Sequence, residues 1–361
     1  MKKPLVTAHR YASLGMAVFW VLQIVSGIYL VYARELDDLT LGASERPPLH
    51  AAIDRAMGEV SKEGGRALEY FISGGLEGQI DLLVDPGTGD LDVWRIDGAD
   101  GRVARVSAWT GPWWRLSLAR GVLVFHKTLL AGAPGRIIVI ISGALLFVNI
   151  LVGLKLAWPP RRRWRAALLP KPPPNPVAFW FSWHRAIALW VLPFALLVVT
   201  TGIGLQVLPT LERLAAGRPM PPAPCLASPP AVTAPLSAAR AVDSALARFP
   251  GAGVVVVVLP GAGGCYDVQM RQPQEWRRAF GTTHVYVDAA SFQVVGTWDA
   301  LAAPLTARSV VALYTLHTGE WAGAAGRILT MLLGAGLLAV TAMGLWLWWS
   351  RRAVRTRGRR A

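Results

Sequence analysis

Four histidines stand at the edges of four long apolar segments of this 361-residue chain, and they fall into two pairs. His9 and His184 each open an apolar run, whereas His126 and His317 each precede an arginine that opens one, at the same spacing in both copies. A single histidine near a membrane surface is usually an interfacial residue. Two matched pairs, one at each end of a set of helices, are the arrangement that holds two haems by bis-imidazole ligation. The pattern therefore predicts electron transfer across a membrane.

The surroundings of these histidines repeat along the chain. The segment HRYASLGMAVFWVLQIVSGIYL at 9–30 aligns without gaps on HRAIALWVLPFALLVVTTGIGL at 184–205. The segment HKTLLAGAPGR at 126–136 aligns on HTGEWAGAAGR at 317–327, also without gaps. Repetition at fixed spacing predicts a duplicated unit of helix, module and helix. The second alignment has the larger offset along the chain, which places an insertion in the second module.

Spacing along the first and third apolar runs matches an α-helix. The interval from His9 to Gly27 equals the interval from His184 to Gly202. It corresponds to about five helical turns and about 27 Å, so each histidine shares one helix face with its glycine. One end of that face offers an imidazole and the other offers bare backbone, against which a flat macrocycle can lie.

The other two histidines are expected on short interfacial helices. The glycines that follow His126 and His317, with Pro134 in the first copy, are predicted to break the helix before the membrane span begins. We therefore expect one haem between His9 and His184, near the cytoplasm, and a second between His126 and His317, near the periplasm. Ligation by two neutral imidazoles leaves no open iron position, which favours electron transfer over oxygen binding.

Two arginines and one rival chemistry complete the expected site. Arg136 and Arg327 open the second and fourth spans, and their guanidinium groups suit either haem propionates or phospholipid headgroups. Metal transport through the same histidines is the rival interpretation. It is disfavoured because the apolar runs carry almost no carboxylates to escort an ion.

Composition predicts a multi-pass protein of the bacterial inner membrane. The chain is 53% hydrophobic and only 16% charged, which is too apolar for an ordinary soluble protein. Its net charge of +15 gathers before the first run, between the second and third, and after the fourth. Positive loops face the cytoplasm, so both termini are expected there, with two modules in the periplasm. Nucleic-acid binding is excluded, since no such motif accompanies the charge.

We therefore predict a membrane α-helical fold with four transmembrane helices, a two-fold internal repeat and two small α+β periplasmic modules. The expected parts are a first transmembrane helix at 1–33, module 1 at 34–125, an interfacial helix and second span at 126–158, a basic Pro-rich cytoplasmic loop at 159–176, a third span at 177–207, module 2 at 208–316, an interfacial helix and fourth span at 317–350, and a basic cytoplasmic tail at 351–361.

Each module has a helix pattern followed by a hairpin pattern. Helices are predicted at 49–62 and 235–249, and hairpins at 79–97 and 283–298, where alternating apolar residues flank a turn. The two modules are expected to form a cleft. His50 and His284 do not match one another at equal spacing and are interpreted as ordinary surface or packing residues.

The two cysteines, Cys225 and Cys265, both lie in module 2. A disulfide is plausible in the oxidising periplasm, and two independent thiols are the alternative. Covalent attachment of a c-type haem is excluded, because the chain has no C-x-x-C-H motif.

The segments at 9–30, 126–136 and 317–327, with VYVDAASFQVVGTW at 285–298, resemble the PepSY-associated transmembrane family. Its members include inner-membrane ferric-siderophore reductases of the FoxB type. The resemblance implies two haem b groups within four helices, an oxidoreductase activity that reduces siderophore-bound ferric iron in the periplasm, and PepSY-like modules. It transfers the ligand role to His9, His126, His184 and His317, but transfers no siderophore contacts.

The electron source is expected outside the chain. No G-x-G-x-x-G nucleotide site is present, so a membrane quinol or a cytoplasmic reductase must supply electrons. Two alternatives stay open. One is a haem-containing conduit for a quinone or a protein acceptor, and the other is a non-enzymatic module that binds a periplasmic partner.

Overall fold

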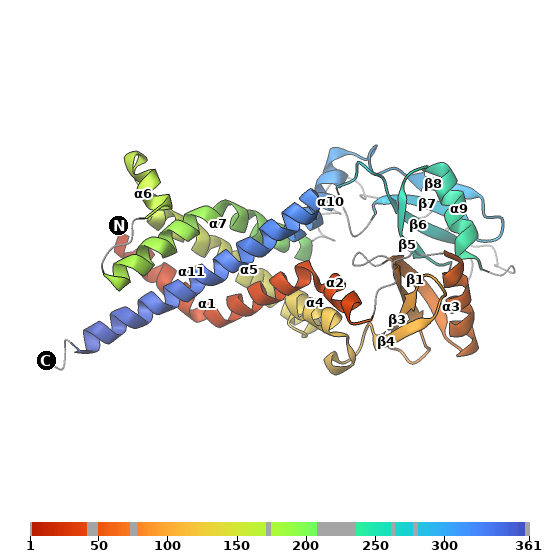
Figure 1. Cartoon of the computed structure of the whole chain (residues 1–361), viewed down its shortest axis with the longest axis horizontal. Helices are drawn as coiled ribbons and strands as arrows, with labels where there is room; N and C mark the ends of the chain where they lie inside the picture. Colours follow the sequence, from red (N-terminus) through yellow and green to blue (C-terminus); the bar gives the residue numbers. More distant parts are fainter. Residues whose placement is uncertain are drawn as a thin grey trace.

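The computed structural model describes residues 2–41, 50–72, 78–170, 175–207, 236–260, 264–276 and 281–357. These residues form a long helical bundle at one end and a β-sheet region at the other (Figure 1). Both chain termini lie at the end of the bundle that is farther from the sheet, which we call the distal end. The end of the bundle next to the sheet is called the proximal end.

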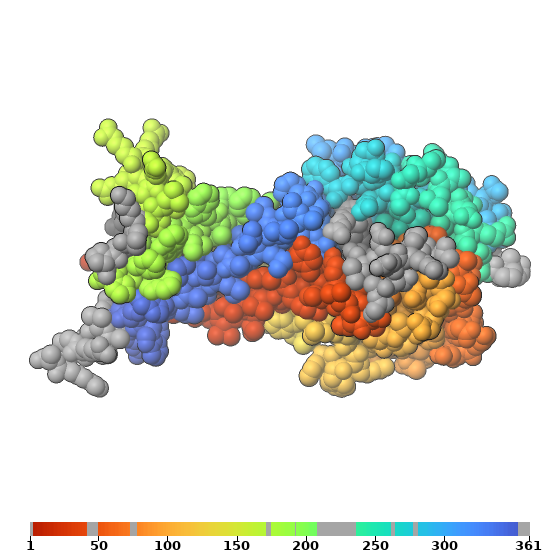
Figure 2. Space-filling view, in the orientation of Figure 1, coloured from red at the N-terminus to blue at the C-terminus, as the bar shows by residue number. Residues whose placement is uncertain are grey.

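Four long helices make the bundle: α1 (Lys2–Val31), α5 (Gly132–Ala157), α7 (Pro176–Gln206) and α11 (Gly323–Arg357). Helices α1 and α7 each pack against both α5 and α11, so α1 and α7 occupy opposite corners. Helix α11 runs along one face of the bundle between α1 and α7 (Figure 2). Large apolar side chains such as Val18, Ile137 and Leu332 point outward and are more than half exposed, as a lipid environment requires.

Three described helices are long and apolar enough to cross a membrane: Lys3–Val31, Gly132–Ala157 and Glu320–Arg352. The remaining long helix, α7, is bent by 57° between Pro176–Val191 and Pro193–Gln206, and it makes a fourth span if these two parts are one. Pro193 has no backbone N–H to donate and its ring crowds the preceding turn, which explains a bend here.

Short helices connect the bundle to the sheet region. They are α2 (Ala33–Leu39), α4 (Leu118–Thr128) and α10 (Leu305–Thr318), with 3₁₀ turns at Trp113–Arg115 and Glu320–Ala322. At the distal end, a 3₁₀ turn at Arg161–Arg163 and the short helix α6 (Trp164–Leu168) lie between α5 and α7. Histidines 126 and 317 lie near the ends of α4 and α10, on short helices as expected. The break after α4 lies at Leu129 and Leu130, which both have positive φ. Pro134 falls in the first turn of α5, where a missing N–H costs nothing.

Two glycines allow α5 and α11 to begin in close contact with the ends of the short helices α4 and α10. A Cβ at Gly135 would lie 1.7 Å from the carbonyl oxygen of Thr128, and one at Gly326 would lie 2.1 Å from that of Gly319. No side chain fits at such distances. The two glycines therefore fix where α5 and α11 begin relative to the two short histidine-bearing helices.

The sheet region is one antiparallel sheet of eight strands in the order β4-β3-β2-β1-β5-β6-β7-β8. Its strands are β1 (Arg66–Ile72), β2 (Gln79–Asp85), β3 (Asp92–Asp97), β4 (Val103–Ala108), β5 (Gly253–Val258), β6 (Cys265–Arg271), β7 (Thr283–Asp288) and β8 (Val294–Trp298). Helices α3 (His50–Lys62) and α9 (Ala238–Arg248) cover one face. Their alanine and valine side chains pack on Tyr70, Tyr266 and the other buried residues of that face.

The two predicted modules share this sheet. Strands β1 and β5, one from each module, pair antiparallel, with Tyr70 opposite Val257. The helices and hairpins predicted from sequence are present as α3, α9, β2–β3 and β7–β8. The expected cleft is not seen between β1 and β5, because the modules meet edge to edge. Pairing in this way satisfies backbone groups that two separate sheets would leave at open edges.

A buried ion network ties the bundle to the sheet. Arg95 on β3 binds Asp81 on β2 and both Asp37 and Asp38 on α2, and the side chain of Asp38 is fully buried. Arg105 on β4 also binds Asp37. Several charges share a small volume, so removing any one leaves its partners buried without compensation. Helix α2 continues from α1, so this network fixes the sheet to the proximal end of the bundle.

Cys265 at the start of β6 is disulfide-bonded. Cys225 lies outside the described residues.

Candidate functional site

Each of the four histidines predicted as ligands packs its ring against a glycine of another helix. The distances that a Cβ on each glycine would have to the histidine Cε1 are 3.0 Å for Gly153 to His9, 3.4 Å for Gly344 to His184, 3.3 Å for Gly27 to His126 and 2.7 Å for Gly202 to His317. Three of these distances are too short for an ordinary contact. Glycine is therefore what allows the Cε1 edge of each imidazole to approach the neighbouring backbone.

The same ring nitrogen is engaged in all four histidines. In three of them Nδ1 faces the carbonyl oxygen one helical turn before the packing glycine: Asn149 for His9 at 3.3 Å, Val340 for His184 at 3.0 Å and Val198 for His317 at 2.9 Å. Nδ1 of His126 faces the Ser26 hydroxyl at 2.9 Å, and that hydroxyl gives its own proton to the carbonyl of Gln23. A carbonyl only accepts, so Nδ1 must carry the proton and donate. The proton-free Nε2 is then left as the ligand atom, and the ring orientation is fixed.

Hydroxyl groups add to this contact at the proximal end. The Oγ of Ser26 lies 2.9 Å from Nδ1 of His126, and the Oγ1 of Thr201 lies 3.5 Å from Nδ1 of His317. Both hydroxyls also donate to carbonyls of their own helices, Ser26 to Gln23 and Thr201 to Leu197. Each hydroxyl therefore lies beside the packing glycine and helps to hold the imidazole in one orientation.

The proximal histidines face one another. The ring centroids of His126 and His317 are 6.4 Å apart, and the ring planes are inclined by 47°. Two imidazoles that bind one metal from opposite sides need nearly this separation: about 2 Å for each bond, plus about 1.1 Å from each nitrogen to its ring centre, gives about 6 Å. The spacing therefore fits a single atom held between the two rings.

The proximal imidazoles are neutral in this environment. Burial lowers the pKa of His126 to about 4, and repulsion between the two rings if both were protonated acts in the same direction. Burial also lowers the pKa of His317, against a backbone hydrogen bond to Val198 that acts in the opposite direction. Neutral imidazole is the form that binds a transition metal, so both rings are in the ligating state at neutral pH.

The distal pair comes from opposite corners of the bundle. His9 lies on α1 and His184 on α7. Each rests on a helix that packs between these corners, His9 on α5 and His184 on α11. The two pairs are separated along α1 by the interval from His9 to Gly27, which is about 27 Å of helix. The structure thus brings the rings of His126 and His317 together at the proximal end and places His9 and His184 on opposite corners at the distal end.

Several polar atoms near these rings are buried without a hydrogen-bond partner in the described structure. They are Nε of Arg10 and of Arg185, Nε2 of Gln23, Oδ1 of Asn149 and Nε1 of Trp183. Each belongs to a residue that is next to a ligand histidine in sequence or that supplies a carbonyl of these contacts. Buried polar groups are normally paired, so their clustering here indicates a missing polar partner.

The predicted arginine pair is asymmetric. Arg327 is 6% exposed and binds Glu35 and the carbonyl of Val31, with its guanidinium over the ring of Tyr32. Arg136 is exposed at the start of α5. Contact of either residue with a haem propionate stays a prediction. The guanidinium of Arg327 is already paired with the carboxylate of Glu35.

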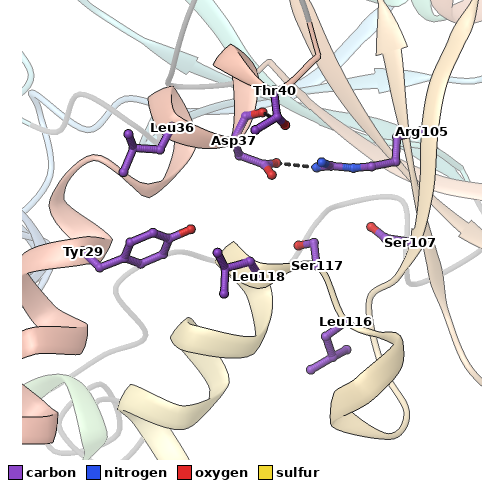
Figure 3. A pocket seen from close by; sticks show the side chains of 9 residues that line it. All are labelled: Tyr29, Leu36, Asp37, Thr40, Arg105, Ser107, Leu116, Ser117 and Leu118. Atoms are coloured by element: carbon purple, nitrogen blue, oxygen red, sulfur yellow. Dashed lines mark hydrogen bonds and ion pairs between the residues drawn. The ribbon is translucent and has the colours of Figure 1, made fainter.

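A pocket of about 300 Å³ lies where the bundle meets the sheet, beside the helix that carries His126 (Figure 3). It lies between α1, α2, the start of α4 and strand β4. Tyr29 and Leu118 border it toward the bundle, and the ion pair of Asp37 with Arg105 borders it toward the sheet. The pocket combines apolar walls with hydroxyl groups and one ion pair.

The remaining histidines have local partners within the sheet region. His50 meets the hydroxyl of Tyr70 at 3.0 Å, and His284 meets Asp267 at 2.8 Å. In the described residues no group of three or more His, Cys, Asp or Glu side chains is placed to hold a metal ion. Two imidazoles alone can complete the coordination of a metal ion whose other ligands come from a chelating molecule.

Sequence reasoning missed the role of the second glycine set. Gly153 and Gly344 are repeated positions, and they lie under His9 and His184 as Gly27 and Gly202 lie under the other two histidines. The signal was their separation along the chain, which equals the separation of His126 and His317. Ser26 and Thr201 were also missed, although each directly precedes a glycine that the spacing had singled out.

Comparison with known proteins agrees with the fold. An alignment of 262 residues at 30% identity covers 64% of this chain and 63% of Uncharacterized protein PA4219 of Pseudomonas aeruginosa. The match thus spans less than two thirds of that relative. Residues 6–351 match the PepSY-associated TM region, from the first bundle helix to the last. The chain therefore belongs to the family of the PepSY-associated TM region.

Proposed function

We propose that this protein is an inner-membrane oxidoreductase that holds two haem b groups and passes electrons through the membrane to ferric siderophores in the periplasm. The observation that carries the proposal is common to all four histidines. Each Nδ1 is committed to a hydrogen-bond acceptor, a backbone carbonyl for His9, His184 and His317 and the Ser26 hydroxyl for His126, and each Nε2 is left to bind a metal. A structural histidine has no need to be held in this way at four separate places.

The bundle contacts support a duplicated ligand set. The carbonyls of Gln23 and Val198 occupy equivalent positions of the sequence repeat, and so do those of Asn149 and Val340. The carbonyl that each imidazole meets, directly or through the Ser26 hydroxyl, is thus repeated together with the imidazole. We therefore infer two equivalent halves and four spans, in which α7 crosses as a single helix bent near Pro193.

The residues present fit the group proposed. Bare backbone at Gly27, Gly153, Gly202 and Gly344 leaves the rings room to approach their helices, and the 6.4 Å between the proximal rings suits one shared metal atom. Bound haem supplies a metal that gains and loses one electron without changing its ligands. The chain's contribution is to fix both imidazoles, exclude water from them and keep them neutral.

The electron path follows from the positions of the pairs. Basic residues gather at the distal end, which we assign to the cytoplasm, and the sheet region then faces the periplasm. A quinol or a cytoplasmic reductase delivers electrons at the distal pair, and the acceptor takes them at the proximal pair. Hard oxygen ligands hold ferric iron more tightly than ferrous iron, so one added electron loosens the complex.

The test uses the full chain purified in detergent and placed in lipid vesicles. A membrane-permeable quinol supplies electrons, and ferrous iron is trapped outside by a ferrous-specific chelator. We expect reduction of a trihydroxamate ferric complex by the intact protein, and loss of it in His317→Ala and His184→Ala. His284→Ala, in the sheet region, is the matched control and should keep the activity.

Three outcomes separate this proposal from its alternatives. Haem that is reduced by quinol but never reoxidised by ferric chelates would indicate a conduit to another acceptor. Protein without haem, and with no change in any histidine variant, would indicate a non-enzymatic module. Haem retained in full when His9, His126, His184 and His317 are each replaced by alanine would contradict the ligand assignment itself.

A further inference from the structure

Two arginines at the distal end have the same unusual environment. Arg10 directly follows His9, and Arg185 directly follows His184. In both residues the Nε atom is buried and has no hydrogen-bond partner among the described residues. Neither guanidinium takes part in an ion pair of the described structure, although that of Arg10 lies over the ring of Tyr11. The two arginines are also equivalent positions of the sequence repeat, so the same feature occurs once in each half.

The chain itself offers these guanidinium groups no anion. Residues 1–34, 118–207 and 321–361, which contain all four bundle helices, include no aspartate and no glutamate. A guanidinium stays charged at every physiological pH, and its buried Nε–H groups need an acceptor. A bound anion at the level of the distal histidines would satisfy both arginines.

We propose that Arg10 and Arg185 bind the two propionate carboxylates of the haem held between His9 and His184. This inference rests on the proposed function. A residue next to a ligand lies about 1.5 Å farther along the helix axis, so both arginines stand at the height of the iron ligands. Guanidinium presents paired N–H groups that match the two oxygens of a carboxylate. Two arginines from opposite corners match two propionates on one macrocycle.

The proximal end shows why the distal arginines differ from Arg327. That arginine lies well beyond His317 along the chain and already has a carboxylate partner, Glu35. Arg10 and Arg185 are partly buried, and each has a buried Nε atom and no carboxylate partner among the described residues. The two ends of the bundle therefore differ. At the proximal end the arginine pairs with a carboxylate of the protein, whereas at the distal end the proposed carboxylates are those of the bound haem.

The test compares protohaemin with its dimethyl ester, which lacks both negative charges. Full-length protein carrying His317→Ala is stripped of haem and titrated with each compound, so that only the distal site binds. A charge-assisted hydrogen bond typically contributes a factor of about 10 to 100 in affinity, so the ester should bind at least tenfold more weakly. With Arg10→Gln and Arg185→Gln added, the two compounds should bind within about threefold of each other.

Arg161→Gln is the matched control, since Arg161 is exposed at the same end of the bundle. It should leave the preference for protohaemin unchanged. The same titration in the protein with all four histidines, followed as haem per chain, covers the case in which His317→Ala fails to fold.

The outcomes separate this inference from the proposed function. A preference that survives in the arginine variant, or one absent before substitution, would overturn the inference alone. Rescue of the variant's thermal stability by phosphatidylglycerol, with equal binding of acid and ester throughout, would overturn it too and assign the two arginines to a lipid phosphate instead. Protein that binds neither compound would overturn both the inference and the proposed function.

Discussion

Replacing the four site glycines by alanine should weaken haem binding in an order set by the structure. At Gly202 the new Cβ would lie 2.7 Å from Cε1 of His317, at Gly153 3.0 Å from His9, at Gly27 3.3 Å from His126 and at Gly344 3.4 Å from His184. Carbon atoms in ordinary contact are about 3.5–4.0 Å apart. The ring must therefore shift by about 0.8 Å for Gly202→Ala and scarcely at all for Gly344→Ala.

A shift of that size exceeds what a ligand site tolerates, which is about 0.5 Å. Overpacking costs about 1–3 kcal/mol, so Gly202→Ala should weaken the proximal haem by about 5- to 150-fold. The pyridine haemochrome assay should then fall from two haems per chain toward one. Gly344→Ala should stay near two, with Gly153→Ala and Gly27→Ala between them.

Gly15→Ala is the matched control, because nothing lies within 4 Å of a Cβ at that bundle position. It should keep both haems. Equal haem content in all five variants would show that haem binding does not depend on the close approach of each histidine ring to its glycine. Loss of haem in Gly344→Ala with retention in Gly202→Ala would refute the geometric reasoning.

Three further predictions concern neighbouring groups. Ser26→Ala should lower haem affinity at the proximal site by about 10- to 100-fold, more than Thr201→Ala, because its hydroxyl is closer to Nδ1. An equal loss in haem titrations of both variants would contradict this. Arg95→Ala should destabilise the sheet region by about 3–5 kcal/mol in denaturant unfolding, whereas exposed Arg66→Ala should cost under about 1 kcal/mol. Burial, with Asp267 nearby, raises the pKa of Glu69. Its folded form thus binds a proton more tightly than the unfolded form, and stability falls as pH rises through that pKa. Glu69→Gln should raise the melting temperature at pH 7 and leave it unchanged at pH 4. An equal change in melting temperature at both pH values would show that ionisation of Glu69 is not the cause.

Much of the bundle and the placement of its four histidines could be predicted because the physics involved is local. A helix brings residues a whole number of turns apart to one face, and a glycine at the end of that spacing predicts a close neighbour. The short helices that carry His126 and His317 follow from the residues after them, although the break lies at Leu129 and Leu130 rather than at Pro134. Left-handed backbone at a leucine depends on tertiary packing, so no sequence pattern marks it.

Long-range pairing was harder to predict. Nothing in the residues of β1 or β5 shows that these two strands meet, because alternation specifies a buried face but not a partner across an edge. The partner of Arg327 was missed for the same reason, since Glu35 lies near the opposite end of the chain. The bend of α7 was available from Pro193 alone, yet its direction depends on the neighbouring helices.

The most direct test of the whole account is the amount of haem per chain in protein purified from membranes, with its absorption spectrum before and after dithionite. We predict two haem b groups per chain and a reduced spectrum typical of six-coordinate, bis-imidazole iron. Each variant that replaces one histidine of a pair should carry one haem. A preparation with full haem supply during expression, correct folding and no Soret band would contradict the central claim.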